Sequence, residues 1–162
     1  MNYAGHTMTG QTQLEILIHL MTWAISLTGY TCPGDMPMIV YADHAHFVER
    51  VCEGVDTEKD PCSVRAYYND ETDARIYLNT KYYDINGEWS PEERGIILHE
   101  IVHYLQDMSG RWDGYLDWDD DKLCVERQFR QQEAYEAQDT YMKRVYGIDR
   151  KIPRYYDNCG NN

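Results

Sequence analysis

The stretch HEIVHYLQ, residues 99–106, contains two histidines four residues apart, with a glutamate beside the first. On an α-helix, positions i and i+4 lie on one face, so His99 and His103 can bind a single ion. Imidazole suits zinc, and a catalytic zinc site uses three protein ligands and keeps a fourth position for water. Glu100 would then take a proton from that water. The pattern predicts a zinc site with Glu100 as general base.

The residues around this motif predict the helix that the geometry needs. Ser90, Pro91 and Glu93 form a capping box with a helix-starting proline, so a helix should begin at about Pro91. It should end near Ser109 and Gly110. Its remaining positions would carry the motif into the protein interior, where unpaired polar groups are costly and a metal ion supplies a partner. These apolar positions are Ile96, Ile97, Leu98, Ile101, Val102 and Leu105.

A third ligand has to come from outside the motif. The extension that supplies a third histidine in metzincins is absent, because Gln106 and Ser109 occupy its places. Residues 122–146 predict a second long helix that Gly147 ends, and it offers three glutamates. We favour Glu133, because the small Ala134 beside it would let the two helices approach closely. The fallback is Glu126, and Glu136 is turned about 60° away from the face that the other two share.

These residues resemble the gluzincin zinc metallopeptidases, in which two histidines and a helical glutamate bind zinc. QEAYEAQ, residues 132–138, is also similar to a signature of small bacterial metallopeptidase-like domains, although Gln131 stands where an acid often precedes. The resemblance implies peptide-bond hydrolysis, with His99, His103 and Glu133 as ligands and Glu100 as base. Ala137 departs from the pattern, because a supporting aspartate stands at that place in thermolysin-type enzymes.

The resemblance also implies how a substrate is held. In such folds an edge strand above the zinc helix pairs with an extended peptide, and residues 74–79 are the candidate here. The oxyanion needs a donor, and a phenolic hydroxyl on the second helix is plausible. Tyr135, Tyr141 and Tyr146 all qualify, and the sequence does not choose among them.

The rest of the chain predicts a small α+β fold. We expect a helix over residues 13–28, a strand over 38–42, a short helix over 44–52 and a β-hairpin of residues 63–68 and 74–79. Residues 109–121 should form an acidic, solvated loop, and residues 151–162 a polar tail. The whole chain, residues 1–162, is expected to be one zincin-like domain with a short antiparallel sheet packed against the motif helix and the second long helix.

Composition excludes some partners. The 162 residues carry 28 acidic against 15 basic side chains, a formal net charge of -13, which disfavours nucleic acid. The apolar run at residues 14–30 is interrupted by Glu15 and His19, so we expect no membrane span. No basic residue precedes Arg50, so no signal peptide is expected. We interpret His19, His44 and His46 as structural or surface residues.

The five cysteines form no CxxC pair. Cys52 and Cys62 could close a short loop in an oxidising compartment, and one thiol of the five must stay free or pair between chains. Buried, reduced thiols account for the pattern equally well. The compartment and the oligomeric state are therefore left open.

The leading hypothesis is a zinc-dependent endopeptidase that acts on a peptide or protein. One alternative is a non-catalytic binding or regulatory module in which zinc holds the two helices together. Another is hydrolysis of a non-peptide amide, which shares the chemistry and differs in the pocket. A structural metal site has no need of Glu100 beside it, so the function of this residue separates the hypotheses.

Overall fold

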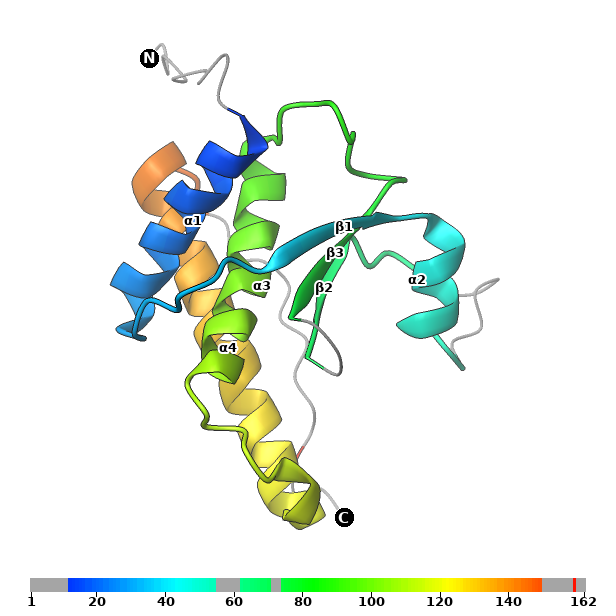
Figure 1. The fold of residues 1–162 in the computed structure, drawn as a ribbon, viewed down its shortest axis with the longest axis vertical. Helices are drawn as coiled ribbons and strands as arrows, with labels where there is room; N and C mark the ends of the chain where they lie inside the picture. Colours follow the sequence, from blue (N-terminus) through cyan, green and yellow to red (C-terminus); the bar gives the residue numbers. More distant parts are fainter. Residues whose placement is uncertain (1–11, 55–61, 71–73, 150–158, 160–162) are drawn as a thin grey trace.

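The computed structural model describes residues 12–54, 62–70, 74–149 and 159, and it has an α+β fold (Figure 1). Three longer helices lie on one side of a small sheet and a short helix lies on the other. The elements in chain order are α1 (Gln13–Thr28), β1 (Met38–Ala42), α2 (His44–Arg50), β2 (Ala66–Asn69), β3 (Arg75–Asn79), α3 (Pro91–Met108), the 3₁₀ turn η1 (Tyr115–Asp117) and α4 (Asp120–Tyr146).

Capping residues mark the bounds of the long helices, although α4 begins at Asp120 instead of the expected Lys122, and α2 ends at Arg50, two residues before the expected end. The Ser90 hydroxyl accepts from the Glu93 N–H, and the Glu93 carboxylate accepts from the Ser90 N–H, so the predicted capping box of α3 is confirmed. Asp119, from the acidic loop, caps α4 by accepting from the Lys122 N–H. Gly147 ends α4 with φ 69°, a left-handed conformation that glycine adopts without strain.

The sheet differs from the expected antiparallel arrangement. Its strand order is β1-β3-β2, and β3 pairs antiparallel with β2 but parallel with β1. The predicted hairpin of β2 and β3 is confirmed, although residues 71–73 of its turn lie outside the described residues. The chain passes through α2 and β2 before it returns as β3, and this connection allows β1 to run parallel to β3.

Alternation along the strands divides the interior between the two faces of the sheet. Ile76 and Leu78 of β3 belong to the main core beneath α1, α3 and α4. Tyr77, between them, packs on a smaller cluster with Phe47 of α2 and the Cys52–Cys62 disulfide. The two faces are thus buried by different helices, and the main core positions α3 and α4 against each other.

Two disulfides are formed. Cys52–Cys62 is the pair that the sequence allowed, and Cys124 of α4 bonds Cys159, while Cys32 is free and exposed. Apart from Cys159, the predicted tail at residues 151–162 lies outside the described residues. In the part of the chain that the structure describes, no helix is both long and apolar enough to cross a membrane.

Candidate functional site

α3 brings the two histidines of the motif together in the interior. The Nε2 atoms of His99 and His103 lie 3.2 Å apart, and each side chain is 7% exposed. Burial lowers the pKa of His99 to about 4 and the pKa of His103 well below its usual value. Both rings are therefore neutral near pH 7, the state in which imidazole binds a metal ion.

The pair fits the ligands of a tetrahedral metal ion. Zinc–nitrogen bonds of about 2.0–2.1 Å at tetrahedral angles place two ligand atoms roughly 3.3 Å apart. His103 Nδ1 lies 2.9 Å from Gln106 Oε1, which can only accept, so this nitrogen carries the proton and Nε2 presents a lone pair toward His99.

Gln106, the last residue of the opening stretch, holds His103 in place. Its Oε1 also accepts from Arg130 Nε, and its Nε2 donates to the Arg130 carbonyl and to Glu133 Oε2. These partners determine the orientation of the amide, because the guanidinium can only donate and the carboxylate can only accept. Gln106 is fully buried. The sequence analysis missed its role, although a glutamine three residues after His103 on an apolar helix was a usable signal.

Glu133 does not join the histidines in this structure. Its Oε2 accepts from Gln106 Nε2 and from the Tyr30 hydroxyl, each at 2.8 Å. Glu126 pairs with Arg111, and Glu136 accepts from Gln132. Among residues 12–54, 62–70, 74–149 and 159, no three histidine, cysteine, aspartate or glutamate side chains form a group that could hold a metal ion.

A glutamine of α4 lies against the histidine pair instead. Gln131 Oε1 is 3.2 Å from His99 Nε2. The Tyr135 ring lies one helical turn further along and packs edge-on against the His99 ring, with centroids 4.6 Å apart.

Glu100 is a buried acid on the side of α3 that faces β2. Its Oε2 accepts from the Tyr68 backbone N–H at 2.9 Å. Burial raises the pKa of Glu100 to about 7, and the Tyr68 N–H and the charge of Arg130 oppose that rise. A carboxyl group that titrates near neutral pH is suited to both accepting and donating a proton.

β2, and not β3, is the strand beside Glu100, so the predicted location of the substrate strand was wrong. Residues 74–79 were the candidate, but β3 is the central strand and is paired on both sides. Just before β2, the Arg65 carbonyl accepts from the Asn79 N–H of β3, whereas the Tyr68 N–H of β2 donates to Glu100 of α3. Because backbone direction alternates along a strand, the outward groups of Ala66 and Tyr68 face the site.

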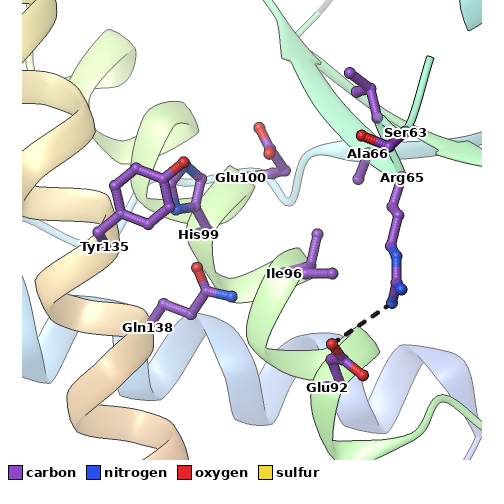
Figure 2. A pocket seen from close by; sticks show the side chains of 10 residues that line it. Ser63, Arg65, Ala66, Glu92, Ile96, His99, Glu100, Tyr135 and Gln138 are labelled. Atoms are coloured by element: carbon purple, nitrogen blue, oxygen red, sulfur yellow. Dashed lines mark ion pairs between the residues drawn. The ribbon is translucent and has the colours of Figure 1, made fainter. Parts of the chain in front are cut away.

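A pocket of about 410 Å³ opens between α3, α4 and the residues leading into β2 (Figure 2). The pocket wall includes His99, Glu100 and Tyr135. At the far end of the pocket from the histidine, Arg65 and Glu92 form an ion pair with a nitrogen–oxygen distance of 3.7 Å. Of the three phenols considered as oxyanion donors, only Tyr135 is among the residues that line this pocket. The Tyr141 and Tyr146 hydroxyls lie 3.2 Å from each other.

The other histidines have neighbours that fit structural roles. His46 Nε2 lies 2.7 Å from the Tyr67 hydroxyl, and its ring stacks on Tyr77. His44 Nδ1 lies 3.0 Å from the Asn79 amide nitrogen. The His19 ring packs edge-on against Tyr141, and burial lowers the pKa of His19.

Comparison of the sequence with models of protein families and with curated proteins, and of the structure with solved structures, finds no match. A functional interpretation of the site therefore depends on its own geometry.

Proposed function

We propose that this protein hydrolyses peptide bonds with the help of a metal ion, zinc by its ligand chemistry, held by His99 and His103. The observation that carries the proposal is the pair of neutral imidazole Nε2 atoms 3.2 Å apart, next to a buried carboxyl group at the wall of a pocket. Bound zinc supplies a Lewis acid that polarises a carbonyl group and acidifies a water molecule.

Glu100 accepts the proton of the attacking water and passes it to the leaving amine. Its carboxyl group lies in the same pocket as His99, and its hydrogen bond to the Tyr68 N–H fixes its orientation. A positioned general base of this kind contributes roughly 10²- to 10⁴-fold to the rate. The hydroxyl of Tyr135, whose ring packs against His99 in the same pocket, donates to the oxyanion.

The substrate lies along the residues that enter β2. Ser63, Val64, Arg65 and Ala66 line the pocket, and the outward backbone of Ala66 faces α3. Backbone pairing along such a segment binds an extended peptide with little sequence preference, and the pocket receives one side chain. An extended peptide is therefore the substrate that this surface fits.

The arrangement of α3 and α4 disfavours the alternative of a purely structural metal. Gln106 already joins α3 to Glu133 and to the Arg130 carbonyl of α4 through hydrogen bonds. Fully satisfied buried networks of this kind hold helices together by themselves. A metal ion is therefore not needed to hold α3 and α4 together. If the metal were purely structural, the buried Glu100 next to it would have no function.

The test is metal content, by elemental mass spectrometry, together with cleavage of an unstructured peptide library. We expect near-stoichiometric zinc in the wild-type protein and in Glu100→Gln, and loss of zinc in His103→Ala. Cleavage should fall by roughly 10²-fold or more in Glu100→Gln. His46→Ala, a histidine on the opposite face of the sheet, should retain both metal and activity. Absence of zinc from the wild type, even after zinc is added, contradicts the proposal.

A further inference from the structure

The histidine pair needs a third protein donor, and the usual residue types do not supply it. This step rests on the function proposed above. Among the described residues, no aspartate, glutamate, cysteine or further histidine completes the pair as a group that could hold a metal ion. Three protein ligands are the rule for catalytic zinc. The third donor is therefore sought among the neutral side chains that touch His99 and His103.

Gln131 is the side chain in that position. Its Oε1 lies 3.2 Å from His99 Nε2, the same separation as between the two histidine nitrogens. Both separations are close to the roughly 3.3 Å expected between two ligands of one tetrahedral ion. His99 Nε2 thus has the His103 nitrogen and the Gln131 amide oxygen as neighbours at equal distances.

Glu133, two residues further on, has a different set of contacts. Residues two apart on a helix point about 200° away from each other, so Gln131 and Glu133 do not present their side chains to the same atoms. Glu133 Oε2 holds two hydrogen bonds of 2.8 Å, from Tyr30 and Gln106. Moving Oε2 to the histidines would break both bonds and leave the Gln106 amide without one of its acceptors.

We infer that the amide oxygen of Gln131 is the third protein ligand of the metal, and that Glu133 is a positioning residue that acts on His103 through Gln106. The hydrogen-bond chain runs from His103 Nδ1 to Gln106 Oε1, and from Gln106 Nε2 to Glu133 Oε2. Such support orients a ligating imidazole and strengthens it as a donor.

This ligand set has a chemical consequence. Two imidazoles and an amide are all neutral, so they leave the full charge of a divalent ion uncompensated. Such a site binds its metal less tightly than one with a carboxylate, because affinity rises with the charge of the ligands. A carboxylate introduced at position 131 should therefore tighten binding, whereas loss of the carboxylate at position 133 should change it little.

The experiment measures zinc affinity of the full chain by competition with a chromophoric chelator. We expect Gln131→Glu to bind zinc roughly tenfold more tightly or better, and Gln131→Leu to bind at least tenfold more weakly. Glu133→Gln keeps an acceptor for Gln106 and should stay within about tenfold of the wild type. With cobalt in place of zinc, the visible absorption spectrum should change in Gln131→Glu and remain unchanged in Glu133→Gln.

Three results overturn the assignment. Loss of zinc in Glu133→Gln, with both Gln131 variants unchanged, would make Glu133 the ligand and leave the proposed function intact. An affinity and a cobalt spectrum of Gln131→Glu equal to those of the wild type would remove Gln131 from the metal, whether or not Gln131→Leu folds. Absence of zinc binding in the wild type would overturn this inference and the proposed function together.

Discussion

Glu100 is an acid that the fold holds in its neutral form over part of the physiological pH range. Burial is the largest cause of the rise in its pKa, and one backbone N–H does not replace the water that an ionised carboxylate loses. In the metal-free protein this residue therefore opposes folding at alkaline pH. The same burial places the carboxyl group in the pocket next to His99, so the cost in stability accompanies a functional position.

A stability measurement checks this cost. The pKa of Glu100 is about 7 in the folded protein, against an ordinary value of 4.5. As pH rises between these two values, the unfolded chain releases a proton that the folded chain retains, so stability falls through this window and stays low above pH 7. The Glu100→Gln variant has no titratable group at this position, so this dependence on pH is lost. At pH 8 the metal-free variant should be more stable than the wild type by about 1–3 kcal/mol, and the difference should vanish near pH 4.

Urea unfolding of the metal-free proteins at pH 4 and pH 8 measures these free energies of unfolding. Glu49→Gln removes the same charge from an exposed position on α2 and serves as the control, with no gain expected. An equal effect of Glu100→Gln at pH 4 and pH 8 would show that ionisation is not the cause.

At the scale of elements, the contact between α3 and α4 supports the site. Three of the four hydrogen bonds of the Gln106 side chain cross this contact, and the fourth holds His103 on α3. Ala134 is fully buried on α4, as its small size led us to expect. Replacing Gln106 by leucine would remove a hydrogen bond from four groups: His103 Nδ1, Arg130 Nε, the Arg130 carbonyl and Glu133 Oε2. The helix contact and the orientation of His103 therefore depend on the same residue.

Gln106→Leu should lower the free energy of unfolding by about 2–4 kcal/mol and weaken zinc binding by roughly 10- to 100-fold. Denaturant unfolding and the chelator competition measure the two effects. Gln132→Leu, an exposed glutamine of α4 that bonds Glu136, is the matched control and should change stability by less than about 0.5 kcal/mol. Unchanged unfolding of Gln106→Leu would mean that the network contributes no stability.

Local signals were sufficient to predict the elements, whereas their neighbours in space were not predictable. The boundaries of α1, α3 and α4 follow from capping residues and apolar spacing, which act within a few residues of each other. The parallel pairing of β1 with β3 joins residues that are 37 apart in sequence, and no local pattern specifies it. His99 and His103 were found because four residues on a helix bring them together. Gln131, the third ligand that we infer, was not considered from the sequence because glutamine is an uncommon metal ligand.

At the scale of the whole molecule, the two hydrophobic clusters should respond separately to change. The main core contains the face of the sheet toward α1, α3 and α4, and the smaller cluster of Phe47, Cys52 and Cys62 lies on the other face. His99, His103 and Glu100 belong to the side of α3, whereas Val64, which lines the pocket, packs on the smaller cluster. Stability can therefore be lost at the smaller cluster without a change at the histidine pair.

Removal of the disulfide in the smaller cluster tests this separation. Cys52 and Cys62 are 10 residues apart, and closing a loop of this size stabilises a protein by about 2–3 kcal/mol, mainly by restricting the unfolded chain. Cys52→Ala/Cys62→Ala should lose that much stability in denaturant and keep the zinc affinity of the wild type. Cys32→Ala, which removes the free and exposed thiol, should alter neither quantity. A loss of zinc affinity in the double variant would mean that the α2 side of the sheet helps to position α3, and that the two faces act as one unit.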